Sequence, residues 1–143
     1  MKIRFLFLMV LFTNFLFSQL PCPLKTGEII PSILRCLGSG DDKSLNRIKS
    51  DNNQVFSLSE GKVVNILLHS DNSKTLLVRT VDDYFYTYSN LDKVFFKPQD
   101  KIEKDALLGF ALFDEDEKKY LVEFQYWKKT ERLKVELNCK KPD

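Results

Sequence analysis

Residues 84–109 read YFYTYSNLDKVFFKPQDKIEKDALLG. The opening run of aromatic residues and threonine favours a β-strand, because aromatic and β-branched side chains are enriched in strands. The polar Asp-Lys pair that follows Leu91 predicts a tight connection. The segment around Pro98 is rich in turn-forming residues and predicts a polar turn before a second strand. The stretch therefore predicts two strands near the centre of a β-domain.

Further short apolar runs flank this stretch on both sides, and they also favour strands. Polar turn clusters separate these runs at intervals of roughly 8–12 residues, which is typical of an antiparallel all-β domain. We therefore expect a single antiparallel β-sandwich or open barrel. The predicted strands are Val55–Ser59, Lys62–Leu68, Thr75–Val81, Tyr84–Tyr88, Val94–Phe96, Ala106–Phe113, Tyr120–Trp127 and Arg132–Leu137.

The chain begins like an exported protein. A positive start is followed by an apolar run, Phe5–Phe17, and by a small residue, Ser18. This order is typical of a secretory signal peptide, and the run is short for a membrane span. An uncleaved N-terminal anchor is the alternative. A lipid anchor on Cys22 is disfavoured because a proline precedes the cysteine. We expect export to the periplasm or the medium, with no stable membrane span after cleavage.

The expected organisation has three parts. Residues 1–18 form the signal peptide, residues 19–50 an irregular N-terminal segment broken by prolines, and residues 51–139 the β-domain. The whole chain has 22 Lys and Arg residues against 20 Asp and Glu residues. Residues 1–18 contain two of the cations and no acid, so the mature chain has 20 of each. This near-neutral balance argues against a nucleic-acid-binding protein, which needs a basic face.

The three cysteines are Cys22, Cys36 and Cys139. Pairing is expected in an oxidising compartment, where two of the three could form one bridge. A Cys36–Cys139 bridge would close a long loop, and a Cys22–Cys36 bridge would close only a local one. The sequence does not choose between them. No Cys-x-x-Cys spacing suggests a structural zinc site.

Three segments together resemble the LytM-type peptidases, family M23, which have the duplicated hybrid motif fold and cut peptidoglycan or other peptides with a bound zinc. Val55–Val64 is similar to the family hairpin Val-x-Ala-x-x-Asp-Gly-x-Val. Tyr86–Leu91 is similar to Thr-x-Tyr-x-His-Leu, and Val94–Gly109 to the Gly-containing segment that follows it. Leu121–Gln125 stands where the family has His-Leu-His-Phe-Glu. The resemblance covers residues 46–127 and implies a LytM-type β-domain.

The same resemblance implies that the zinc ligands are missing. Family members bind zinc through an early His and Asp and through the second His of the late pair, while two further histidines assist the reaction. The corresponding residues here are Asp42, Asn46 and Glu123 for the ligands, with Leu121 and Asn90 at the assisting positions. A catalytic zinc needs about three protein ligands and one open position. We therefore expect a degenerate member without catalytic residues, metal or cofactor.

Other chemistries receive little support from the sequence. The single histidine, His69, precedes a polar turn away from every motif position, where a surface role is the simplest interpretation. Asp41, Asp42 and Glu123 offer oxygen ligands for calcium or magnesium, but acidic loop residues are usually only solvated. No Gly-x-Ser-x-Gly nucleophile motif and no phosphate-binding Gly-rich loop occurs.

Alternate strand residues share a face, so the late segment should line the inherited groove. We expect this groove to bind a peptide, peptidoglycan or a protein partner such as a cell-wall hydrolase, and regulation of such hydrolases is one role that the resemblance implies. The alternatives are a divergent metalloendopeptidase acting on peptidoglycan or peptides, and a structural interaction module. The predicted groove residues are Asn46, Tyr86, Tyr88, Asn90, Leu121, Glu123 and Gln125.

Overall fold

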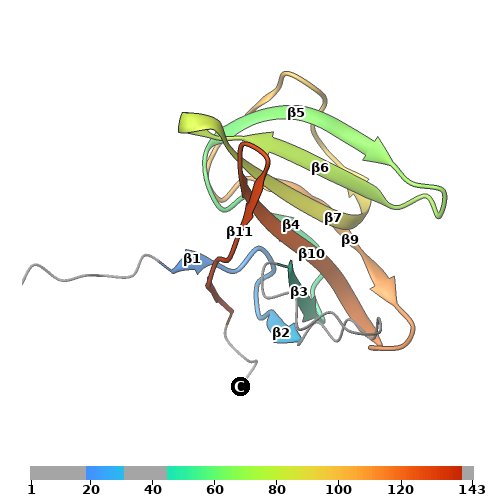
Figure 1. The fold of residues 1–143 in the computed structure, drawn as a ribbon. Helices are drawn as coiled ribbons and strands as arrows, with labels where there is room; N and C mark the ends of the chain where they lie inside the picture. Colours follow the sequence, from blue (N-terminus) through green and yellow to red (C-terminus); the bar gives the residue numbers. More distant parts are fainter. Residues whose placement is uncertain (1–18, 31–44, 140–143) are drawn as a thin grey trace, which may run out of the picture.

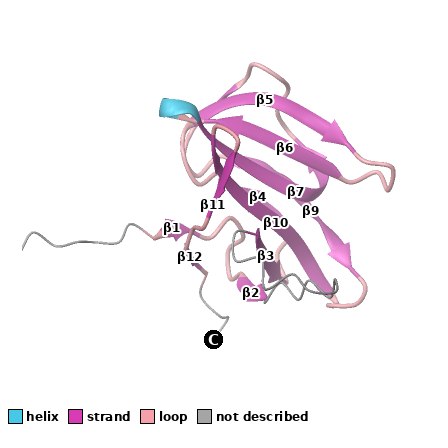
Figure 2. Cartoon of the chain, in the orientation of Figure 1, coloured by secondary structure: helices cyan, strands magenta, loops and turns pink. Residues whose placement is uncertain are grey.

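The computed structural model describes residues 19–30 and 45–139 (Figure 1). These residues form an almost entirely β structure with one short 3-10 turn (Figure 2). None of them belongs to an apolar helix of the length that a membrane crossing needs. The elements are β1 Leu20–Pro21, β2 Glu28–Ile30, β3 Leu45–Ser50, β4 Gln54–Phe56, β5 Gly61–Leu68, β6 Lys74–Arg79, η1 Val81–Asp83, β7 Tyr84–Val94, β8 Lys101–Ile102, β9 Leu107–Asp114, β10 Lys119–Lys128, β11 Glu131–Leu133 and β12 Leu137–Asn138.

Ten of these strands form one open antiparallel sheet, which confirms the predicted all-β fold class. The order along the sheet is β2-β3-β10-β9-β7-β6-β5-β8, with β4 on β9 and β11 on β10. The two long central strands, β7 and β10, also pair directly. Each therefore contacts several neighbours, and together they set the register of the whole sheet.

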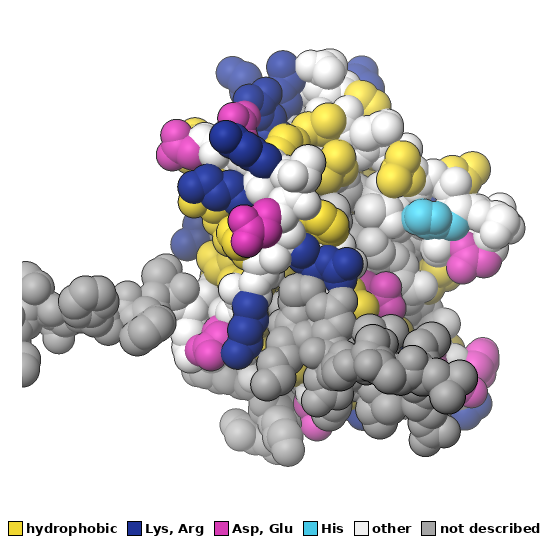
Figure 3. Space-filling model, viewed as in Figure 1, with side chains coloured by type: hydrophobic (Ala, Val, Ile, Leu, Met, Phe, Trp, Pro, Cys, Tyr) yellow, Lys and Arg dark blue, Asp and Glu magenta, His cyan; other side chains and the backbone are white. Residues whose placement is uncertain are grey.

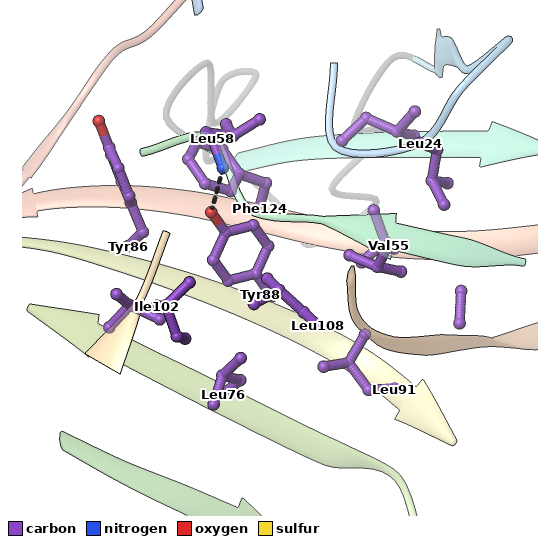
Figure 4. Close-up of a cluster of buried hydrophobic side chains, with 14 of the residues drawn as sticks. Leu24, Val55, Leu58, Leu76, Tyr86, Tyr88, Leu91, Ile102, Leu108 and Phe124 are labelled. Carbon is purple, nitrogen blue, oxygen red and sulfur yellow. Dashed lines mark hydrogen bonds between the residues drawn. The ribbon is translucent and has the colours of Figure 1, made fainter. Parts of the chain in front are cut away.

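The core lies on one face of this sheet. Tyr88 from β7 and Phe124 from β10 are opposite each other in the ladder, and both are completely buried. Their rings lie 5.4 Å apart. The backbone N–H of Leu58 donates a 3.0 Å hydrogen bond to the Tyr88 hydroxyl, which gives this buried polar group a partner (Figure 4). Aromatic and aliphatic side chains from most strands surround this pair.

Three predictions of local structure are wrong. The predicted strand Arg132–Leu137 is interrupted, because β11 ends at Leu133 and β12 begins at Leu137. Residues 45–50, expected to be irregular, form β3, which pairs with β10 along its whole length. Val94–Phe96 is not a separate strand, because Val94 is the last residue of β7. Asn90 has a φ of 65°, and the register shifts between Leu91 and Lys93. These irregularities let β7 bend and pair first with β10 and then with β9.

A disulfide joins Cys22 to Cys139 across 117 residues of sequence. It lies where β1 and β12 form a separate parallel pair. The predicted disulfide is thus present, but it is neither of the two pairings considered from the sequence. Cys36 and the predicted signal peptide, residues 1–18, lie outside the described residues, as do Asp41 and Asp42.

Candidate functional site

The two faces of the sheet differ in character. Val122 and Phe124 of β10 point into the core, whereas Glu123 points to the other face, which we call the groove face. Glu123 is directly opposite Ser89 of β7 on one side and Arg47 of β3 on the other. Directly opposite residues of an antiparallel ladder share a face. The three side chains therefore stand side by side on the groove face.

An open hollow of about 490 Å³ lies at this position, and we call it the groove. Strand residues form its floor, and the β5–β6 hairpin forms a wall. Figure 3 shows this side of the molecule, with the single histidine at the right. The residues that line the groove include Arg47, His69, Asp71, Ser73, Thr75, Ser89, Asn90, Asp114, Leu121 and Glu123.

An ion pair crosses the groove floor. Arg47 Nε lies 3.3 Å from Glu123 Oε1, and about a third of each side chain is exposed. A pair with this exposure contributes about 0–1 kcal/mol to stability. The pair matters more for the chemistry of the groove than for stability, because the Glu123 carboxylate already has a cationic partner.

Asn90 is fixed beside this pair. Its side-chain Nδ2 donates a 2.7 Å hydrogen bond to the carbonyl oxygen of Leu121. Asparagine tolerates the left-handed conformation that the backbone adopts here. Asn90 therefore allows β7 to bend, and it also contributes a polar side chain to the groove.

The sequence interpretation missed the role of the β5–β6 hairpin. His69 Nε2 lies 2.8 Å from Thr75 Oγ1, which donates in turn to Ser89 Oγ at 2.9 Å. Asp71 accepts a hydrogen bond from the backbone N–H of Ser73 at 2.9 Å. Hydrogen bonds from the Ser73 side chain and backbone lower the pKa of Asp71. His69 flanks a turn, as expected, but the β5–β6 hairpin places its side chain at the groove.

The groove contains Asn90, Leu121 and Glu123 of the predicted residues, and Gln125 lies farther along the same face. Gln125 Oε1 accepts a 3.0 Å hydrogen bond from Trp127 Nε1.

The other predicted groove residues point to the core face. Tyr86 and Asn46 are directly opposite Tyr126 and Phe124, and both are buried. Burial raises the pKa of Tyr86 and, more strongly, that of Tyr88. Their predicted place in the groove is wrong because strand alternation turns them away from Glu123.

The residues at those family positions that the structure describes do not fit a catalytic zinc. Leu121 has no donor atom, the Asn90 amide nitrogen is bound to a carbonyl, and Glu123 is paired with Arg47. Asn46, aligned with the zinc-binding Asp, faces the core. Within residues 19–30 and 45–139, no three His, Cys, Asp or Glu side chains are close enough to hold a metal. This donor set lacks the three converging ligands that zinc chemistry requires.

Comparisons with known proteins agree on the fold. No protein-family model matches the chain, and no curated protein has a significantly similar sequence. The crystal structure of the SpoIIIAH and SpoIIQ complex contains a chain with a TM-score of 0.63 and 14% identity, over 81% of this chain and 96% of that one. The solution structure of lysostaphin matches with a TM-score of 0.62 and 15% identity over 80% of this chain, which spans 49% of the lysostaphin chain.

A catalytic domain of the prophage-encoded M23 protein EnpA from Enterococcus faecalis, in mutant form, is also similar. Its TM-score is 0.60 and its identity 13%, over 76% of this chain and 86% of that one. Likeness at this level of identity concerns the fold. The chain has the M23 peptidase fold, and its described residues lack the zinc ligands of that fold.

Proposed function

We propose that this chain, which has the M23 peptidase fold, is an exported, non-catalytic domain that binds a peptide, peptidoglycan or a protein partner in its groove. The observation that carries the proposal is the state of the groove itself. An open hollow is present, and in it Glu123, at a family ligand position, is paired with Arg47, while Asn90, at an assisting position, is bonded to the Leu121 carbonyl oxygen. A site of this kind offers recognition without a metal-activated water.

The groove chemistry supports binding of a polar ligand. Serine and threonine hydroxyls, an asparagine, a histidine and carboxylates line one open hollow. Such groups donate and accept the hydrogen bonds that a peptide backbone or a glycan offers. A domain of the same fold occurs in the SpoIIQ–SpoIIIAH pore-forming complex, which supports a protein partner as one form of the ligand. Regulation of a cell-wall hydrolase is a role of this kind.

Export has two supports. The N-terminal sequence has the charge and apolar pattern of a signal peptide. The Cys22–Cys139 bridge fits an oxidising compartment, where disulfides persist.

A divergent metalloendopeptidase is the second candidate. Its support is that His69, Asp71 and Glu123 line the same hollow, but the three side chains do not come close enough together to hold a metal in this structure. A structural interaction module without a groove function is the third.

The test combines binding with metal analysis. Purified protein is sedimented with insoluble peptidoglycan, and its zinc content and release of peptides are measured in parallel. Asn90→Gly, which keeps the backbone conformation accessible, and Glu123→Gln are expected to weaken co-sedimentation. Glu115→Gln, in the exposed β9–β10 turn, is the matched control. One zinc per chain, together with peptide release that Glu123→Ala abolishes, would show that the domain is an enzyme.

A further inference from the structure

The ladder register arranges the groove face in rows that run across the strands. The first, the groove row, contains Arg47, Glu123 and Ser89, and Thr75 is hydrogen-bonded to Ser89. Two residues farther along the strands, the middle row contains Leu45, Gln125, Thr87, Leu77 and Asn65. Two residues beyond that, the basic row contains Trp127, Phe85, Arg79, Lys62 and Lys101.

The basic row brings like charges together. Lys62 of β5 is directly opposite Arg79 of β6 on one side and Lys101 of β8 on the other. Like charges in directly opposite positions destabilise a sheet. Arg79 is paired with Asp83, whereas none of the ion pairs among residues 19–30 and 45–139 includes Lys62 or Lys101. Glu60 and Glu103 are not members of the row, but they line the same adjacent hollow as its three cations.

The groove end of the same face has the opposite charge. Asp71, Asp114 and Glu123 line the groove with a single permanent cation, Arg47. Figure 3 shows Lys and Arg side chains gathered at the top and left of this side, away from the histidine. Measured along the strands, the groove row and the basic row are four residues apart, which corresponds to about 13 Å. The face therefore has an acidic end and a basic end, with the leucines and Thr87 of the middle row between them.

This pattern matches an extended peptide. Side chains at alternate positions of an extended chain share one face and recur every 6–7 Å or so, the spacing of the rows themselves. We propose that the groove face binds an extended segment of a partner protein with a basic side chain in the groove row, an apolar one over the middle row and an acidic one at the basic row. This inference rests on the proposed function, since it specifies the ligand class of the same groove.

The middle row has no charged side chain, since it consists of Leu45, Gln125, Thr87, Leu77 and Asn65. Leu77 and Leu45 offer contact surface, and the buried Thr87 hydroxyl has no hydrogen-bond partner within the described part of the chain. Opposite charges at both ends fix the position of the segment and disfavour peptides with one kind of charge.

The test uses synthetic pentapeptides with serine at the second and fourth positions. The first has lysine, leucine and glutamate at alternate positions, the second has lysine at both ends, and the third has glutamate at both ends. Each is titrated into ¹⁵N-labelled protein by NMR. The mixed peptide is expected to shift amides in both the groove row and the basic row. It should bind about five-fold more tightly than either like-charged peptide, and less tightly as salt is added.

A charge reversal sharpens the test. Lys62→Glu removes two like-charge neighbours, so the variant should fold at least as well as the original protein. It should bind the mixed peptide about five-fold more weakly, and the peptide with lysine at both ends more tightly. Lys25→Glu is the matched control, because Lys25 is exposed near β2, at the opposite edge of the sheet.

Three results would overturn the inference: no peptide binds at millimolar concentration, Lys62→Glu leaves the peptide preference unchanged, or the protein alone shows concentration-dependent shifts because a second copy covers the face. Each of these is distinguishable from failure of the proposed function. If peptidoglycan binding is still lost in Asn90→Gly, the groove function stands and only the peptide pattern is wrong. If neither Asn90→Gly nor Glu123→Gln changes any binding, the groove function itself fails.

Discussion

Replacing Tyr88 by phenylalanine tests which face of the sheet this residue occupies, because the core face affects stability and the groove face affects binding. The substitution removes one hydroxyl and keeps the ring that packs against Phe124. Tyr88 is completely buried, and Leu58, whose N–H donates to this hydroxyl, is 2% exposed. We expect lower stability and unchanged binding at the groove, because the hydroxyl points away from it.

The magnitude follows from the lost hydrogen bond. The Leu58 N–H would remain buried without a partner, which costs about 1–3 kcal/mol. Urea unfolding followed by the fluorescence of Trp127 measures the change. A domain of this size has a urea dependence of about 1–2 kcal/mol per molar, so the midpoint should fall by about 0.5–3 M.

Tyr120→Phe is the matched control. Tyr120 is partly exposed, and no hydrogen bond of its hydroxyl is found among the described residues, so its loss should change stability by less than about 0.5 kcal/mol. Asn90→Gly should have the opposite effect to Tyr88→Phe: binding to peptidoglycan should weaken, and the urea midpoint should change less. If Tyr88→Phe left the urea midpoint unchanged and weakened peptidoglycan binding, Tyr88 would face the groove and the deduced register would be wrong.

Three further predictions concern the scaffold. Reduction of the Cys22–Cys139 bridge, which spans 117 residues, should lower stability by up to about 4–5 kcal/mol, and equal urea midpoints with and without reductant would contradict this. Gly109→Ala would place a Cβ 1.8 Å from the Lys93 carbonyl oxygen, so we expect a clearly lower melting temperature, and an unchanged melting curve would refute the β7–β9 approach. Burial and the neighbouring tyrosines raise the pKa of Tyr126 from 10.0 to about 12. Because folding favours the neutral phenol, this contribution is present below pH 10 and is lost as the pH rises towards 12. Unfolding measured from pH 9 to 12 should show a steeper loss of stability in the original protein than in Tyr126→Phe, and equal slopes would contradict the shift.

The strands were predictable where apolar residues dominate, as in β5, β6, β9 and β10. The strand β3 was not, because its inward positions include Asn46 and Ser50. Ser50 is nevertheless buried, and its hydroxyl donates to the carbonyl oxygen of Lys25 at 2.9 Å. Polar residues that find local partners can occupy inward positions, and they conceal the alternation that identifies a strand.

The faces of β7 were harder to predict than its existence. Simple alternation places Tyr86, Tyr88 and Asn90 on one face. The left-handed backbone at Asn90 ends that alternation, so Ser89 and Asn90 both line the groove while Leu91 returns to the core. Asparagine permits this conformation, but its presence in the sequence does not predict it. On β10 the alternation continues, and Leu121 and Glu123 both line the groove.

The position of His69 and the disulfide depend on contacts between distant segments. The β5–β6 hairpin brings His69 to the groove only because Thr75 meets Ser89 across the sheet. Cys22 meets Cys139 because β1 pairs with β12. Neither short strand has a sequence pattern strong enough to predict its partner.

The binding of a soluble peptidoglycan digest, measured with and without a strong zinc chelator, tests most directly whether this groove recognises its ligand without metal chemistry. We predict the same dissociation constant in both conditions and an unaltered digest after prolonged incubation. Binding that disappears with the chelator and returns with zinc, together with new cleavage products, would contradict a non-catalytic groove.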